Sequence, residues 1–299
     1  MAQVDVGRGI SLEYERQGDP SRPTVVLIMG LGMQLVAWPQ SLIDGLLDRG
    51  FSVLRFDNRD AGLSTQIDSF HPRGIAGALL RGAVGWPVAA PYTLDDMAQD
   101  AVGLLDALQI DRAHVVGASM GGMVAQIVAA RWPQRTLSLT SIMSTSGHRR
   151  LPPPRLDAIM TFMKRPPHGA SLATLVDHYM HLFSVIGSPG YPTAPAQLRE
   201  RMQRMLSRAF RPHGTARQLL AIAASGDRTA LLPRITAPTL VIHGEADPLV
   251  PVAAGRDSAK RILGAQLLTV PGMGHDLPEA LMPMLAGAIG DHCARAPAK

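Results

Sequence analysis

The stretch Val115-Val116-Gly117-Ala118-Ser119-Met120-Gly121-Gly122 follows a short apolar run and opens a helical pattern that ends at Pro133. A Gly-x-Ser-x-Gly motif between a strand and a helix strains the serine backbone and exposes its side chain above the carboxyl edge of a sheet. Glycine is needed at 117 and 121 because a side chain there would collide across the turn. The alternative is a glycine-rich turn with an incidental serine. We expect Ser119 to be a nucleophile beside a helix N-terminus that favours negative charge.

Short apolar runs flank this stretch on both sides along the chain. They are rich in β-branched residues and seldom alternate with polar ones, which is typical of strands covered on both faces of a parallel sheet. They lie at 24–29, 51–56, 113–116, 137–143, 239–242 and 266–270, after a predicted hairpin at 3–6 and 10–16. Helical patterns at 41–49, 93–108, 120–132 and 278–292 alternate with them. We therefore predict an α/β fold with a mostly parallel, doubly wound sheet.

One segment, residues 148–230, interrupts this alternation. Prolines at 152–154 and 166–167 punctuate it, and the patterns between them are helical, with no strand-like run. A connection of this length between two strands of a sheet is an inserted unit rather than a loop. The sequence predicts one α/β core domain, made of residues 1–147 and 231–299, and a helical cap domain made of residues 148–230.

A serine nucleophile needs a base, and the base needs an acid that orients it. Of the ten histidines, His275 stands directly after the last predicted strand and before the last predicted helix. That position is at the sheet edge where Ser119 is expected. Asp247 follows the preceding strand in a turn-rich segment, and Glu245 is the competing carboxylate. We therefore expect His275 to be the base and Asp247 the orienting acid.

Acyl transfer also needs hydrogen-bond donors for the oxyanion that forms. One donor is the backbone N–H of Met120, the residue after the nucleophile. The loop after the strand at 24–29 reads Met29-Gly30-Leu31-Gly32-Met33, and its glycines allow the backbone to approach a ligand closely. We expect the Leu31 N–H to be the second donor, with the Met33 N–H as the alternative. This chemistry requires neither a metal nor an organic cofactor, and the single cysteine, Cys293, excludes cysteine metal clusters.

These motifs together resemble the α/β-hydrolase-fold serine esterases, and more narrowly the bacterial aclacinomycin-methylesterase-like branch. The resemblance runs over nearly the whole chain and rests on four segments: Met29 to Gly32, Phe56-Asp57-Asn58-Arg59-Asp60-Ala61-Gly62-Leu63-Ser64, Gly117 to Gly122, and Gly244 to Pro251. Met29-Gly30 replaces the His-Gly that is usual in the superfamily, as it does in that branch. The order Ser119, Asp247, His275 matches the order of such hydrolases. The resemblance implies a helical cap at 148–230 and a carboxylic ester substrate.

Several residues allow both a structural and a functional interpretation. For Asp57, Arg59 and Asp60 we favour a buried network that holds their loop over a role in catalysis. A substrate pocket between sheet and cap would be lined by methionines and aromatic residues, which can equally be ordinary core. The candidate lining residues are Met33, Met120, Met143, Met160, Phe162, Met163 and Tyr179. Such a pocket predicts a preference for hydrophobic esters of modest size.

The net charge of +5 at pH 7 raises the possibility of nucleic-acid binding. Residues 148–230 hold 12 basic and 4 acidic residues, so the excess is confined to the cap. Because the segment has no recognised nucleic-acid-binding motif and aromatic residues hardly interleave with its basic ones, we expect solvated arginines on the outer face of the cap and no nucleic-acid partner. The apolar stretch 74–94 contains four glycines and two prolines, which favours a buried or site-covering loop over stable membrane insertion. The start of the chain lacks the layout of a secretory signal, so we expect a cytoplasmic protein, monomeric or homodimeric.

Other activities remain compatible with the same three residues. The triad could open a lactone, cleave a carbon–carbon bond or form peracids, and product analysis would separate these from ester hydrolysis. A non-catalytic ligand receptor on a hydrolase scaffold is a further alternative, but such scaffolds commonly lose a triad member. An aspartate nucleophile, as in haloalkane dehalogenases and epoxide hydrolases, is disfavoured by Ser119 at the turn. A serine hydrolase of carboxylic esters is the function that the sequence favours.

Overall fold

A single mixed sheet organises the computed structural model, which describes residues 1–70, 74–164, 166–167 and 169–296. Its eight strands lie in the order β1-β2-β4-β3-β5-β6-β7-β8. β1 and β2 run antiparallel and form the predicted hairpin, and every pair from β4 to β8 is parallel. The strands are β1 (Ala2–Asp5), β2 (Ser11–Gln17), β3 (Thr24–Ile28), β4 (Ser52–Phe56), β5 (Ala113–Ala118), β6 (Thr136–Ile142), β7 (Thr239–Gly244) and β8 (Gln266–Val270). The predicted α/β fold with a mostly parallel sheet is confirmed.

Helices cover both faces of this sheet. Alternate residues of β3 point to opposite sides, so that Val26 and Ile28 join one apolar core while Val25 and Leu27 join the other. The first core includes apolar side chains of α3 (Leu94–Ala107) and α4 (Met120–Arg131), and the second includes those of α1 (Gln40–Leu47) and α10 (Met282–Arg295). α9 (Val252–Arg261) packs against β7 and β8. Burial on both faces explains why the strand sequences are continuous apolar runs.

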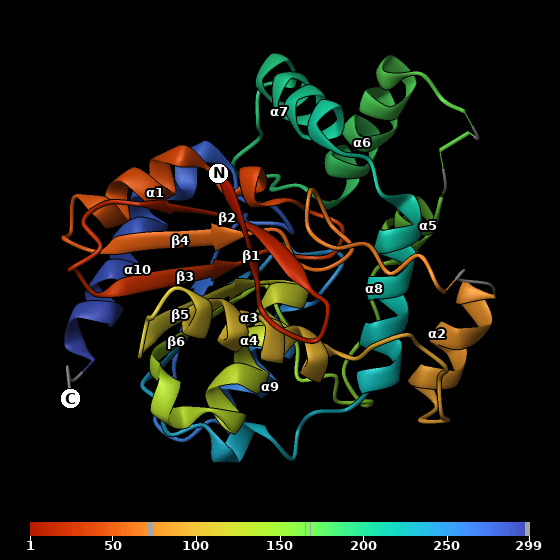
Figure 1. Cartoon of the computed structure of the whole chain (residues 1–299). Coiled ribbons are helices and arrows are strands. Elements are labelled where there is room, and N and C mark those ends of the chain that lie inside the picture. Colours follow the sequence, from red (N-terminus) through yellow and green to blue (C-terminus); the bar gives the residue numbers. More distant parts are fainter. Residues whose placement is uncertain (71–73, 165, 168, 297–299) are drawn as a thin grey trace.

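In the described part of the chain, four α-helices lie between β6 and β7. They are α5 (Leu156–Met163), α6 (Leu172–Ile186), α7 (Pro195–Arg208) and α8 (Pro212–Ser225), called the inserted helices below. Figure 1 shows α6, α7 and α8 beyond the carboxyl ends of β3 and β4. α6 and α7 share a small apolar core of their own, centred on Val176 and Met202. These helices therefore stand over the edge of the sheet where the parallel strands end.

One element differs from the sequence expectation. The stretch 74–94, predicted as a loop, contains α2 (Ile75–Ala83), which packs against α8 (Figure 1). Gly74 begins the helix in a left-handed conformation, with φ of 61°, and the two prolines of the stretch fall after the helix ends. Its exposed residues include Leu80, so the prediction of a buried loop is wrong, whereas the alternative of a segment that covers the site stays a prediction.

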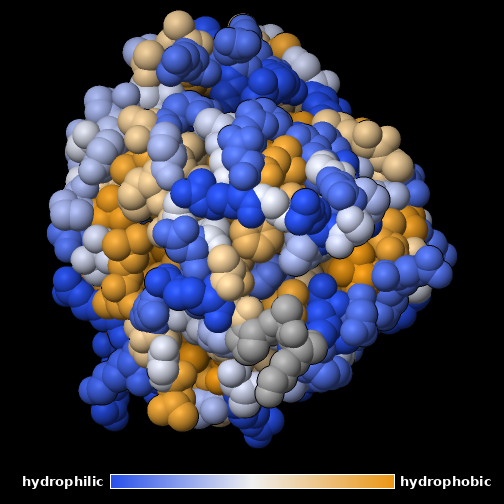
Figure 2. All heavy atoms as spheres, turned by 90° about the vertical axis from the view of Figure 1, so that its left-hand side faces the viewer, coloured by the Kyte–Doolittle hydropathy of each residue, from blue (hydrophilic) through white to orange (hydrophobic). Residues whose placement is uncertain are grey.

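The surface is mixed in character. On the face that carries the C-terminal end of the chain, hydrophobic side chains form separate patches between hydrophilic ones (Figure 2). No helix in the described ranges is both long enough and apolar enough to cross a membrane.

Candidate active site

Ser119 lies at the sharp turn between β5 and α4, where it is the N-cap of the helix with φ of 55° and ψ of −118°. Two flanking glycines make this turn possible. A Cβ on Gly117 would lie 2.1 Å from the Gly121 carbonyl oxygen, and one on Gly121 would lie 1.9 Å from the Ile28 carbonyl oxygen. The Ser119 N–H donates to the Ile142 oxygen of β6 at 2.9 Å. The turn is thus fixed by β3 on one side and β6 on the other. These strands hold Ser119 in a backbone conformation that a residue with a side chain rarely adopts.

Gly121→Ala should destabilise the fold severely, since the added methyl group would meet the backbone of β3, which cannot move aside as a side chain can. We expect a loss of about 3 kcal/mol in the free energy of unfolding, measured by urea denaturation. Gly77→Ala is the matched control, because Gly77 is also helical and nothing lies within 4 Å of its added Cβ. That variant should be unchanged or more stable by about 0.5–1 kcal/mol. Equal effects of the two substitutions would contradict the close packing at the turn.

The structure brings Ser119, His275 and Asp247 into one hydrogen-bonded row. The Nε2 atom of His275 lies 2.9 Å from the Ser119 hydroxyl, and its Nδ1 atom lies 2.7 Å from Oδ2 of Asp247. Because an ionised carboxylate only accepts hydrogen bonds, Nδ1 carries the proton and Nε2 is free to accept one from the serine. The geometry can therefore move a proton from Ser119 to His275.

Asp247 is buried and held from its other side by backbone. Its Oδ1 atom accepts the N–H groups of Leu249 and Val250 at 2.9 and 2.8 Å. His243, also buried, donates from Nε2 to the Val250 oxygen at 2.7 Å and lies 3.6 Å from Oδ2 of Asp247. Burial lowers the pKa of His243, so this second histidine is neutral and adds no competing charge. Glu245 instead accepts a hydrogen bond from Thr269, at an exposed position of the same loop.

The loop that carries His275 is held by the end of α6 and the residues after it, a contact that sequence reasoning missed. The His275 N–H donates to the Ile186 oxygen at 2.7 Å, and the Gly274 N–H donates to the Ser188 hydroxyl at 2.9 Å. Ser188 in turn donates to Asp276 at 2.5 Å. Burial raises the pKa of the Asp276 carboxyl group. The inserted helices therefore touch the histidine loop directly.

The loop after β3 lies against Ser119 as the oxyanion interpretation requires. A Cβ on Gly30 would lie 3.2 Å from the Ser119 Cβ, so the backbone before Leu31 approaches the nucleophile closely. The Met33 N–H donates back to the Gly30 oxygen at 3.2 Å, which occupies the alternative donor within the turn. Met120 is the first residue of α4, so its N–H is one of the groups at the helix N-terminus beside Ser119 that have no partner within the helix. Leu31 and Met120 thus remain the candidate donors.

The predicted pocket residues fall into three environments. Met120 and Met143 are buried in the two apolar cores of the sheet domain, and Met33 packs against both the α1–α10 core and the apolar core of α6 and α7. Tyr179, on α6, packs against that same small core. Met160 is 65% exposed on α5, so its side chain faces solvent and does not line an enclosed pocket, contrary to the prediction. Phe162 and Met163, half-buried on the same helix, stay predictions.

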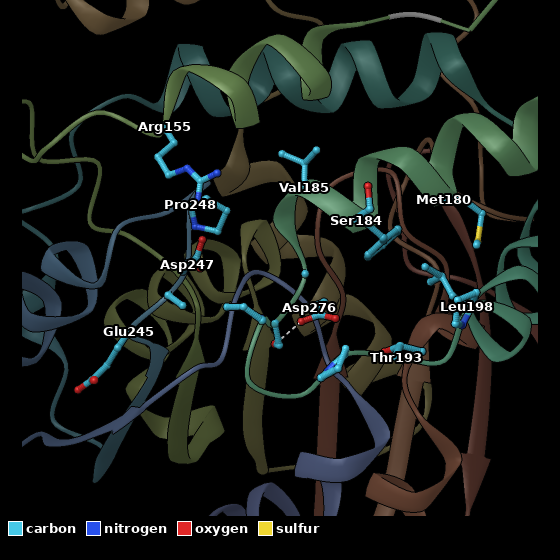
Figure 3. A pocket seen from close by; sticks show the side chains of 17 residues that line it. Arg155, Met180, Ser184, Val185, Thr193, Leu198, Glu245, Asp247, Pro248 and Asp276 are labelled. Carbon is cyan, nitrogen blue, oxygen red and sulfur yellow. Dashed lines mark hydrogen bonds between the residues drawn. The ribbon is translucent and has the colours of Figure 1, made fainter.

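A groove of about 730 Å³ lies between the end of α6, the start of α7 and the loop after β7 (Figure 3). Asp247 and Asp276 border it from one side and Met180 and Leu198 from the other, whereas Ser119 and His275 are not among its lining residues. The groove is bordered by the orienting acid, Asp247, but does not reach the nucleophile, Ser119. We therefore do not assign the substrate to it.

Asp57 and Asp60 sit in the loop after β4 and are fully buried, each paired with an arginine of the inserted helices. Arg208 of α7 binds Asp57 at 2.6 Å, and Arg217 of α8 binds Asp60 through two hydrogen bonds of 2.8 and 2.6 Å. The Tyr92 hydroxyl donates to Asp60 as well, and burial raises its pKa so that the proton is retained. The structural interpretation of this loop fits these contacts. The expectation that arginines of 148–230 are all solvated is wrong for Arg208 and Arg217, because they neutralise buried carboxylates of the core.

Known proteins share this architecture and sequence pattern. The chain is 29% identical to the rhodomycin D methylesterase DnrP of Streptomyces peucetius, over 95% of both chains. It is 26% identical to the 3-oxoadipate enol-lactonase 2 of Acinetobacter baylyi, over 86% of this chain and 84% of that enzyme. The crystal structure of the enol-lactonase from Burkholderia xenovorans LB400 has the same fold, with a TM-score of 0.70 over 98% of this chain and 100% of that one, at 24% identity. A family model described as the alpha/beta hydrolase fold matches residues 23–279, and the chain belongs to that family.

Proposed function

We propose that this protein is a serine esterase that cleaves carboxylic esters of hydrophobic small molecules. One observation carries the proposal: the Ser119 hydroxyl, His275 and Asp247 form a continuous hydrogen-bonded row at the N-terminus of α4. Similarity to a methylesterase over nearly the full length of both chains supports an ester as the substrate. The resemblance drawn from the sequence points the same way.

In the mechanism, Ser119 Oγ attacks the ester carbonyl carbon while Nε2 of His275 takes the hydroxyl proton. Asp247 holds the proton on Nδ1 and stabilises the imidazolium that forms. The N–H groups of Leu31 and Met120 would bind the tetrahedral oxyanion. His275 returns its proton to the departing alcohol. His275 then takes a proton from water, which attacks the acyl-enzyme, and gives that proton to Ser119 Oγ as the acid leaves.

The inserted helices would close the site from above, as a cap formed by residues 148–230. Met33 lies where the apolar core of the sheet meets that of α6 and α7, close in the chain to Leu31, and Tyr179 packs on the same small core. We infer an adaptable apolar pocket at this junction. It would favour a hydrophobic acyl or alcohol group over a charged one.

A lactone is the second candidate substrate, because a curated relative is named as an enol-lactonase. Opening a lactone uses the same attack, with the alcohol remaining attached to the acyl group. A substrate panel separates the possibilities: p-nitrophenyl and methyl esters of short, medium and aromatic acids, a γ-lactone and a vinylogous diketone, with products identified by mass spectrometry. We expect the highest kcat/KM on a hydrophobic ester. Faster turnover of the lactone, the diketone or a small charged ester would overturn this assignment.

A further inference from the structure

Gln218 of α8 is fully buried, and both the oxygen and the nitrogen of its side-chain amide form hydrogen bonds with backbone outside the inserted helices. Its Oε1 atom accepts the Gly32 N–H at 2.8 Å, and its Nε2 atom donates to the Arg59 carbonyl oxygen at 2.7 Å. Gly32 is the residue after Leu31. The amide therefore fixes the peptide plane next to the proposed oxyanion donor, although Gln218 is 186 residues away in the chain.

The packing around this hydrogen bond is tight. Gly32 has φ of 67°, and a Cβ there would lie 2.7 Å from Oγ1 and 2.9 Å from Cγ2 of Thr215, one turn before Gln218 on α8. Two residues further along the loop, Gln34 donates to the carbonyl oxygens of Met205 and Ala209 at 2.8 Å each. The loop from 30 to 34 is thus held at Gly32 and Gln34 by contacts with the inserted helices and the residue that follows α7.

α8 itself cannot slide easily on the core. The neighbour of Gln218, Arg217, is bound to the buried Asp60 through two hydrogen bonds, and Asn58 in the same loop donates to the Met29 oxygen at 2.9 Å. The loop after β4 therefore holds α8 from one side and the start of the oxyanion loop from the other. Gln218 therefore joins two segments, α8 and the loop after β3, that the loop after β4 also holds in place.

We propose that Gln218 is a positioning residue that holds the Leu31 N–H in place for the oxyanion. The inserted helices then do more than cover the substrate, since one of them sets the geometry of the catalytic loop. This proposal rests on the proposed function. Because the oxyanion exists only in the transition state and in the tetrahedral intermediate, a misplaced donor lowers kcat and leaves substrate binding almost unchanged.

The first test is Gln218→Met, which keeps the length of the side chain and removes both hydrogen bonds. We expect kcat on the preferred ester to fall about 10- to 100-fold, with KM within about 2-fold of the wild-type value. The Ki of a trifluoromethyl ketone, which forms an oxyanion on Ser119, should rise by the same factor. Gln126→Met is the matched control: Gln126 is equally buried, and its Nε2 atom donates to the Ser141 hydroxyl away from the loop. It should leave kcat and the Ki unchanged.

A second pair of variants tests the loop if Gln218→Met fails to fold. Gly32→Ala should push the loop away from Thr215 and reduce kcat by a similar factor. Adding Thr215→Ala removes both atoms that the new methyl group would meet most closely, and kcat should recover part of the loss, since the strain of an alanine at a φ of 67° remains. Recovery of activity by a second substitution on α8 identifies movement of the loop, which a general loss of stability does not produce.

The outcomes separate this inference from the proposed function. If wild-type protein hydrolyses the ester while Gln218→Met retains wild-type kcat and Ki, the positioning role is wrong and the esterase assignment stands. A rise in KM with kcat unchanged would also overturn it, because that pattern assigns Gln218 to substrate binding. If the wild-type protein turns over no ester, lactone or diketone, the proposed function itself fails.

Discussion

Ser119→Ala should lower kcat on the best ester by about 10⁴- to 10⁶-fold, because it removes the hydroxyl that His275 is placed to deprotonate. His275 points its Nε2 atom at the Ser119 hydroxyl, and the strained turn presents that hydroxyl beside the helix N-terminus. The variant would keep the proposed oxyanion donors and the inserted helices, so any activity that remains reflects water attacking a bound ester. Hydrolysis of a p-nitrophenyl ester and covalent labelling by a fluorophosphonate are the two measurements.

The matched control for this variant is Ser138→Ala. Ser138 is buried, whereas Ser119 is half-buried, and the Ser138 hydroxyl lies 2.8 Å from Nδ1 of His114 on the neighbouring strand, away from the turn. That substitution should preserve both ester hydrolysis and labelling. If Ser119→Ala keeps either at the wild-type level, the nucleophile is another residue and the mechanism proposed above is wrong. Circular dichroism should show the same fold for all three proteins, since the Ser119 side chain is not part of either apolar core.

Local sequence signals were enough to predict the sheet and the row of catalytic candidates. The turn at Ser119 has a recognisable motif because a side chain at Gly117 would collide with Gly121, four residues further along the chain. Asp247 and His275 could be placed because residues after neighbouring parallel strands meet at the same edge of a sheet. The start of α3 is local in the same way, because Thr93 and Asp96, three residues apart, cap it with reciprocal hydrogen bonds.

Contacts between distant segments have no such signal. Gln218 meets Gly32 and Ser188 meets Gly274 only once the inserted helices have packed on the core. A buried glutamine on a helix reads in the sequence like any polar residue on a solvated face. The prediction that Arg208 and Arg217 are solvated failed for the same reason, because the sequence does not show which buried carboxylate neutralises an arginine. The residues that join the inserted helices to the rest of the fold could therefore not be identified from the sequence.

Asp247→Asn should lower kcat about 10⁴-fold while leaving the fold intact. The reason lies in the two backbone N–H groups of Leu249 and Val250, which both point at Oδ1. In the variant, the amide oxygen must stay on these donors, so the amide NH₂ group faces Nδ1 of His275. Nδ1 then has to accept a hydrogen bond, and the ring proton moves to Nε2. An imidazole with its proton on Nε2 cannot take the proton of Ser119, even though every distance in the row is preserved.

The neighbouring acid supplies the control for this prediction. Glu245→Gln changes the same charge two residues away, on an exposed side chain whose partner is the Thr269 hydroxyl, and kcat should stay at the wild-type level. Reciprocal results, with Glu245→Gln inactive and Asp247→Asn active, would assign the orienting role to Glu245 instead. Loss in both variants would mean that the negative charge of the loop matters rather than the tautomer of His275. Only a loss confined to Asp247→Asn, with KM and the free energy of unfolding close to wild type, supports control of the tautomer by Asp247.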